Sequence, residues 1–241
     1  MTESSPVLSV RLLERIVIGT VGPAYPETEV RIVDPETKEP ICPSDDHPHG
    51  GKGIKGEIHV RGPQVMSGYF RSPEETAKVL HHGWLNTGDL GEITFNDCLK
   101  ILGRIKDTVV LLSGENLEPV PIENRIKQSE LVENCMVVGQ DQKYLGLLVV
   151  PSAQGYSEIH PEWDSIDKIV ASEEARKRLD AYIHDAISSK SGFKSYERIH
   201  SWRWIEKPFE VGDEITSTFK LKRHVVADKY ADLIDSMYRH E

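Results

Sequence analysis

Residues 103–123, GRIKDTVVLLSGENLEPVPIE, combine charge, strand and turn signals in an order that a simple buried segment would not need. Arg104, Lys106 and Asp107 place charges of alternating sign on a short turn. Residues 108–112 follow as a β-branched and apolar run, which is typical of a buried strand. This order predicts a hinge that enters a new domain.

The second half of the same stretch predicts a turn followed by a helix. Residues 113–116, Ser-Gly-Glu-Asn, have turn composition, and Pro119 and Pro121 suit the opening of a helix. We expect Glu123 in the first helical turn, where a carboxylate interacts favourably with the positive end of the helix dipole.

A second motif lies upstream, at residues 83–91, GWLNTGDLG. Asp89 stands between glycines and ahead of a strand, so its carboxylate could meet a ligand where the backbone approaches closely. Taken alone, the Gly-Asp pair more often marks a hairpin turn. Arg104 follows Asp89 along the chain, and the two motifs together favour a ligand-binding role for Asp89.

The part of the chain beyond residue 107 predicts a mixed α/β domain. Residues 135–139 and 145–150 are nearly continuous apolar runs, which indicates strands of a small buried sheet. Residues 173–188 place apolar side chains at helical spacing. Trp202 and Trp204 share one side of a later strand, where packing is favoured over stacking on a ligand.

These motifs together resemble adenylate-forming (AMP-binding) enzymes, and within that family they are most similar to long-chain fatty acyl-CoA synthetases. The resemblance implies an α/β (α+β) fold with a small, mostly β subdomain at residues 1–102, from the end of a large N-terminal domain. Residues 103–107 would be the hinge, and residues 108–241 a mobile lid domain with a small sheet and flanking helices.

The resemblance also implies roles for single residues. Asp89 and Arg104 match the pair that contacts the ribose of ATP, and a carboxylate can accept hydrogen bonds from both hydroxyls. Lys106 matches the hinge position about which the lid rotates. Gly114 matches the loop that lets the thiol-bearing arm of coenzyme A pass during thioester formation.

Three further positions carry over towards the ends of the chain. Thr2 would contact the ATP phosphates and Glu3 would hold Mg²⁺, a cation that prefers carboxylate and phosphate oxygens. Lys220 matches the lysine that stabilises charge at the α-phosphate in the transition state. Phe219 replaces the glycine that commonly precedes this lysine, which leaves Lys222 as the alternative.

The implied reaction is acyl-adenylate formation from a fatty acid and ATP, followed by transfer of the acyl group to coenzyme A with release of AMP. No Gly-rich phosphate loop with Ser, Thr and Lys precedes Asp89. We therefore expect the C-terminal part of such a ligase, inactive without the missing N-terminal part. The alternatives are a ligase for aryl or short-chain acids, a ligase for an acyl-carrier protein, and a noncatalytic interaction module.

Composition limits the partners. A formal charge of −10 over 241 residues argues against general binding to nucleic acid, which favours a basic surface. No apolar run reaches the roughly 18 residues of a membrane span. Three widely spaced cysteines indicate reduced thiols rather than a disulfide framework. The expected location is cytoplasmic, with peripheral membrane association possible for the full enzyme.

Overall fold

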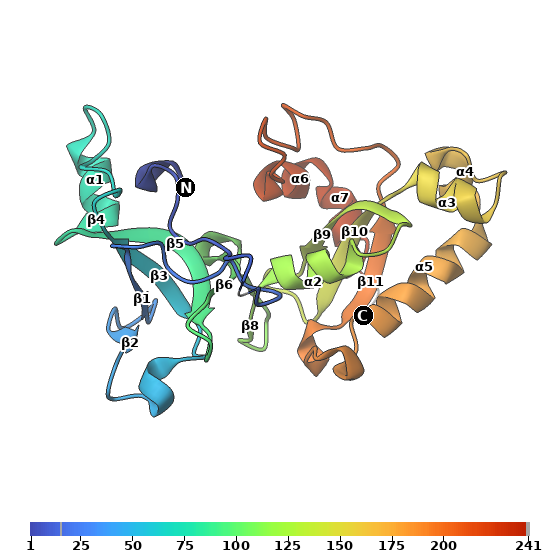
Figure 1. Cartoon of the computed structure of the whole chain (residues 1–241). Coiled ribbons are helices and arrows are strands. Elements are labelled where there is room, and N and C mark those ends of the chain that lie inside the picture. Colours follow the sequence, from blue (N-terminus) through green and yellow to red (C-terminus); the bar gives the residue numbers. More distant parts are fainter. Residues whose placement is uncertain (15, 240–241) are drawn as a thin grey trace. The chain divides into compact units, whose positions relative to one another are not determined.

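The structure, a computed structural model, describes residues 1–14 and 16–239. It divides into two compact units, Met1–Lys106 (unit 1) and Asp107–Glu241 (unit 2) (Figure 1). The boundary falls at Lys106, the residue matched to the hinge. Rotation about this residue stays a prediction. No helix within the described residues combines the length and apolar character that crossing a bilayer requires.

Unit 1 is built on one antiparallel sheet of six strands. Five of them follow the order β2-β1-β3-β5-β4, and β6 pairs with residues 89–93 of β5. The long strand β5 therefore carries three neighbours along its length. The elements of this unit are η1 (Thr2–Ser4), β1 (Glu29–Val33), β2 (Pro40–Cys42), η2 (Pro48–Gly51), β3 (Gly56–Arg61), α1 (Pro73–Val79), β4 (Leu80–His81), β5 (Trp84–Ile93), β6 (Leu99–Arg104) and η3 (Ile105–Asp107), which ends on the first residue of unit 2.

The unit 1 sheet has one apolar face. Ile32 lies opposite Ile58, and Val60 lies opposite Leu85, with all four side chains at most 1% exposed. Alternate residues of the same strands are charged or polar, because successive side chains of a strand point to opposite faces. The apolar face forms the core of unit 1 and holds β5 in place.

Unit 2 contains a three-stranded sheet and a short hairpin. In the sheet, β10 lies between β9, which is antiparallel to it, and β11, which is parallel. The elements are β7 (Val109–Val110), β8 (Asn116–Leu117), α2 (Pro119–Ile126), β9 (Val132–Val138), β10 (Leu145–Pro151), α3 (Ala153–Ile159), α4 (Ile166–Ala171), α5 (Glu173–Ala186), η4 (Ser189–Ser191), η5 (Ser195–Glu197), β11 (Ile199–Trp204), α6 (Arg223–Lys229) and α7 (Ala231–Asp235).

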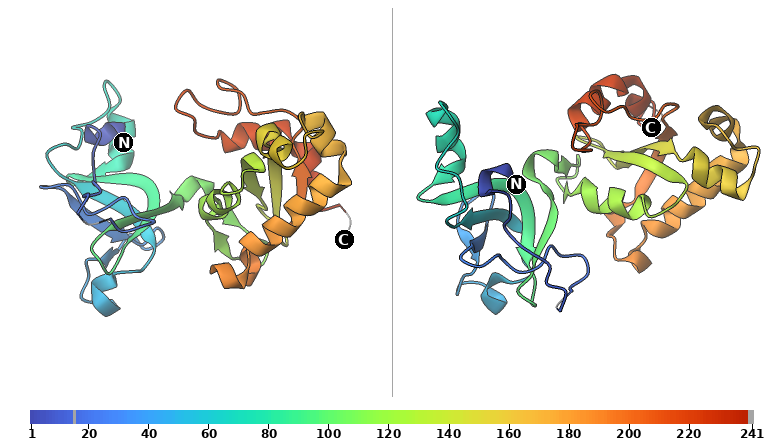
Figure 2. Two further views of the ribbon diagram at one scale, coloured as in Figure 1. Left: turned by 45° about the vertical axis from the view of Figure 1, so that its right-hand side comes forward. Right: turned by 45° about the horizontal axis from the view of Figure 1, so that its top comes forward.

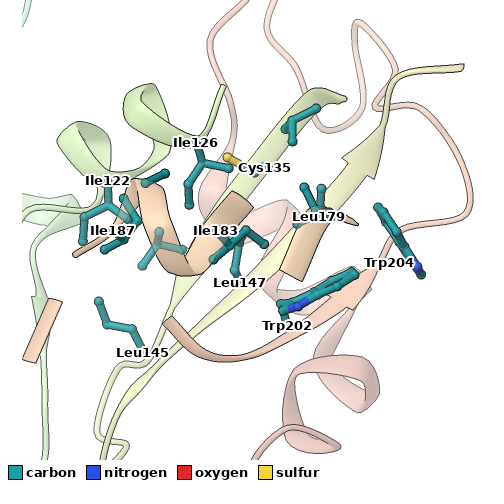
Figure 3. Packing of buried hydrophobic residues seen from close by; sticks show 14 of the residues in the cluster. Ile122, Ile126, Cys135, Leu145, Leu147, Leu179, Ile183, Ile187, Trp202 and Trp204 are labelled. Carbon is teal, nitrogen blue, oxygen red and sulfur yellow. The ribbon is translucent and has the colours of Figure 1, made fainter. Parts of the chain in front are cut away.

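Helices cover both faces of the unit 2 sheet. On one face, Leu147 packs with Ile122 of α2 and Leu179 of α5 in a large apolar cluster, part of which Figure 3 shows. On the other face, Leu148 packs with Val226 of α6 in a second cluster. The right-hand view of Figure 2 separates the red α6 and α7 from the orange α5, with the strands between them. All seven residues of β10 are consequently buried.

The mixed α/β fold expected for the chain is confirmed, with local corrections. The strand expected at residues 108–112 is only Val109–Val110, paired with β8. The expectation that Glu123 lies in the first turn of its helix is wrong, since α2 begins at Pro119 and Glu123 is buried. The packing role of Trp202 and Trp204 is confirmed, since both rings are buried and meet edge to face at 4.7 Å.

Candidate functional site

A bulge in β5 positions the Thr-Gly-Asp motif. Glu57 of β3 pairs with Leu90 and His59 pairs with Asn86, so residues 87–89 lie opposite the single residue Ile58. Such bulges re-aim side chains beside functional sites. The expectation that Asp89 stands ahead of a strand is therefore wrong, because it lies within β5.

The bulge has a hydrogen-bonded support. The Thr87 hydroxyl donates to the carbonyl of Ile58 at 2.7 Å and accepts the N–H of Asp89 at 3.1 Å. Gly88 has φ +70°, in the left-handed region that glycine adopts without steric cost. Thr87 is itself buried. The backbone before Asp89 is thus fixed on the β3 side.

Asp89 and Arg104 come together as the sequence motifs suggested. They are direct partners across β5 and β6, and Arg104 Nε lies 2.8 Å from Asp89 Oδ1. The Asp89 side chain is 23% exposed and that of Arg104 is 43% exposed, so both reach solvent. A carboxylate that reaches solvent and is oriented by a guanidinium can accept hydrogen bonds from a diol.

Thr2 and Glu3 lie in the same unit, in the short helix η1. The Glu3 carbonyl accepts the N–H of Met66, and its carboxylate accepts the Tyr69 hydroxyl at 3.1 Å. Burial and this acceptor raise the pKa of Tyr69, which keeps the hydroxyl protonated as the donor. Thr2 is exposed. The Tyr69 hydroxyl thus orients Glu3.

The described residues contain no group of three or more His, Cys, Asp or Glu side chains placed to hold a metal ion. Glu3 offers one carboxylate. Magnesium in nucleotide sites is often held by one or two carboxylates together with phosphate oxygens. The single carboxylate of Glu3 therefore fits a magnesium ion that is also bound by phosphate oxygens and water.

The hinge and hairpin residues are accessible. Lys106 is exposed within η3. Gly114 closes the turn between β7 and β8, where its N–H donates to Leu111 and its φ is +93°. Nothing lies within 4 Å of where a Cβ would stand on Gly114. Its backbone conformation, rather than local crowding in this structure, is what favours glycine there.

Lys220 lies in a closed loop before α6. Thr216 and Lys220 pair through two bonds, because the Thr216 N–H donates to the Lys220 carbonyl and the Thr216 hydroxyl accepts the Lys220 N–H. Phe219 has φ +58°, the left-handed conformation in which glycine is most readily accommodated. The loop therefore keeps a glycine-like backbone despite the larger residue. The Lys220 side chain is exposed.

Lys222 has a different role in the same loop. Its ammonium donates to the carbonyl of Gly212 at 2.8 Å, which ties the two sides of the loop together. Glu214 lies in the same loop, and this residue is buried, with 1% of its surface exposed. Burial alone raises the pKa of the Glu214 carboxyl group, but hydrogen bonds from Lys229 and from the N–H of Glu210 bring it below its ordinary value.

Sequence reasoning missed a buried ion pair that joins this loop to the rest of unit 2. Arg223, the first residue of α6, contacts Glu123 Oε2 at 2.5 Å and lies 3.9 Å from Asp107. The other oxygen of Glu123 accepts the N–H of Val137 at 2.7 Å. Arg223 and Glu123 are 100 residues apart in the chain, so no local sequence pattern predicts that they pair.

Family models match most of the chain. Residues 106–241 match the model described as AMP-binding enzyme C-terminal domain, and residues 1–70 match the model described as AMP-binding enzyme. The chain belongs to the AMP-binding enzyme family. This assignment confirms the resemblance drawn from the motifs, and the family consists of adenylate-forming ligases and their relatives.

Named relatives of this AMP-binding chain are fatty acid ligases. The long-chain-fatty-acid--[acyl-carrier-protein] ligase AEE15 of Arabidopsis thaliana is 34% identical over 99% of this chain and 32% of its own length. The long-chain-fatty-acid--CoA ligase FadD15 of Mycobacterium bovis is 29% identical over 100% of this chain and 37% of its own length. The chain spans about a third of the length of the curated relatives it matches.

Solved structures agree on the fold. The adenylation domain of a carboxylate reductase from Mycobacterium chelonae matches with a TM-score of 0.69 at 23% identity. The match covers 90% of this chain and 32% of that one. At this identity the likeness supports the fold of the AMP-binding family.

The buried pair gives a stability prediction. Arg223→Ala leaves the Glu123 carboxylate, 6% exposed, without its charged partner, which should cost about 3–5 kcal/mol of unfolding free energy. Adding Glu123→Gln should recover part of that loss, because an amide needs no counter-charge. Urea unfolding followed by tryptophan fluorescence reports mainly on unit 2, which holds Trp163, Trp202 and Trp204.

Arg178→Ala is the matched control in unit 2, since its pair with Glu174 is solvent-exposed and should contribute below about 1 kcal/mol. Equal costs for Arg178→Ala and Arg223→Ala would contradict a structural role for the buried pair.

Proposed function

We propose that this chain acts as the C-terminal part of an ATP-dependent ligase that activates long-chain fatty acids as acyl-adenylates and passes them to coenzyme A. The observation that carries the proposal is the Asp89–Arg104 pair, which the β5 bulge holds at a solvent-accessible edge of unit 1. In this role the Asp89 carboxylate accepts the ribose hydroxyls of ATP, and Arg104 orients the carboxylate beside them.

Lys220 is the residue we assign to charge stabilisation at the α-phosphate. Its backbone is fixed by Thr216, while its exposed ammonium has no hydrogen-bond or ion-pair partner within residues 1–14 and 16–239. Lys222, in contrast, uses its ammonium to close the loop on Gly212. These contacts support Lys220 over Lys222 for a positive charge placed near the phosphate as negative charge develops.

The remaining assignments concern magnesium and the acceptor. Glu3 would bind Mg²⁺ together with the ATP phosphates, and the ion supplies electrostatic stabilisation of the phosphoryl oxygens. Thr2 would contact the phosphates, Lys106 would be the hinge and Gly114 would lie beside the thiol arm of coenzyme A. The 34% identity with AEE15 favours an acyl-carrier protein as the second candidate acceptor.

The ribose assignment predicts a specific loss of nucleotide binding. Asp89→Asn should weaken AMP binding by about ten- to a hundredfold, because hydrogen bonds to charged groups contribute about 1.5–3 kcal/mol. Titration of the isotope-labelled chain with AMP, followed by NMR amide shifts, measures affinities down to the millimolar range. Asp97→Asn is the control, since Asp97 lies in the adjoining β5–β6 turn, paired with Lys52. Equal binding by both variants would refute the assignment.

The lysine assignment predicts a ranking of two variants. We would join this chain to the N-terminal two thirds of AEE15 and measure pyrophosphate release with a long-chain fatty acid. Lys220→Ala should lower the rate by about a hundredfold or more, as expected for loss of a transition-state charge contact. Lys222→Ala should lower it by less than about tenfold. The reverse ranking would transfer the role to Lys222, and holo-acyl-carrier protein in place of coenzyme A would identify the acceptor.

A further inference from the structure

The position of Asp89 depends on groups that do not themselves face the ligand. Residues 87–89 form three backbone positions opposite Ile58, and a regular antiparallel ladder would offer only one. The two extra residues leave backbone N–H and C=O groups of β5 without hydrogen-bond partners on β3. Such groups require other hydrogen bonds when they are buried. Figure 1 shows β5 as the long central strand of unit 1 on which this irregularity occurs.

The Thr87 hydroxyl supplies two of those hydrogen bonds. Since a hydroxyl has one proton, its 2.7 Å contact with the Ile58 carbonyl makes it the donor there. Its lone pair then accepts the N–H of Asp89 at 3.1 Å. One hydroxyl therefore links β3 to the peptide group of the residue whose carboxylate we assign to the ribose.

We propose that Thr87 is a positioning residue for Asp89: its hydroxyl holds the bulge so that the Asp89 carboxylate is aligned for both ribose hydroxyls. The inference rests on the proposed function, because it assumes that Asp89 binds ribose. The Thr87 side chain does not touch the nucleotide in this account. Its effect on binding is transmitted through the backbone at residues 87–89.

The test compares AMP with 2′,3′-dideoxy-AMP, which lacks both ribose hydroxyls, by NMR titration of the full chain. Thr87→Val keeps the shape of the side chain but removes the hydroxyl, so it should weaken AMP binding about tenfold and leave dideoxy-AMP binding nearly unchanged. Thr87→Ser restores the hydroxyl and should retain AMP affinity within about threefold.

Thr94→Val is the matched control, because the Thr94 hydroxyl accepts the N–H of Cys98 in the turn of the same β5–β6 hairpin. It should keep the preference of the unmodified chain. A Thr87→Val variant that keeps that preference, or that loses both ligands equally, overturns the positioning role. An unmodified chain that binds both ligands equally, or neither, overturns the proposed ribose site and this inference with it.

Discussion

The strand β5 carries two more residues between its pairs with β3 than a regular ladder allows, and the proposed nucleotide site of unit 1 depends on this constraint. Because side chains alternate between the faces of a strand, two extra residues leave the alternation unchanged on either side of the bulge, but residues 87–89 themselves leave the regular ladder with β3. Leu85, before the bulge, lies in the apolar core, while Asp89, within the bulge, lies beside Arg104 with its carboxylate reaching solvent. The core face of the sheet and the polar edge can therefore belong to one strand.

In unit 2, buried carboxylates have a comparable structural role. Lys220 is exposed on a loop, and both ends of that loop are fixed by buried carboxylates: Glu214 binds Lys229, and Glu123 binds Arg223. Removing one partner of such a pair costs more than the pair contributes, because the remaining charge stays buried. An exposed lysine on a firmly anchored loop loses less freedom when it meets a phosphate than a lysine on a loose one. Asp89, on its hydrogen-bonded bulge, should likewise lose less conformational freedom when it meets a ligand.

The sequence indicated the mixed fold and the packing of Trp202 and Trp204 through strand periodicity, and the family resemblance led us to expect Asp89 and Arg104 at one ribose. The sequence could not place the bulge, since a glycine at a positive φ serves a turn and a bulge equally well. It also assigned Glu123 to the helix dipole. The actual partner, Arg223, is 100 residues away, and only the folded sheet brings the two together. Local patterns predict local structure, whereas buried charge pairs are set by tertiary packing.

The most direct test of the account is a crystal structure of this chain with AMP bound. The account predicts that the 2′- and 3′-hydroxyls lie within about 3 Å of the Asp89 carboxylate oxygens, with Arg104 still beside them and the bulge at residues 87–89 unchanged. A nucleotide bound with its ribose away from Asp89, or a bulge that rearranges into a regular ladder, would contradict it.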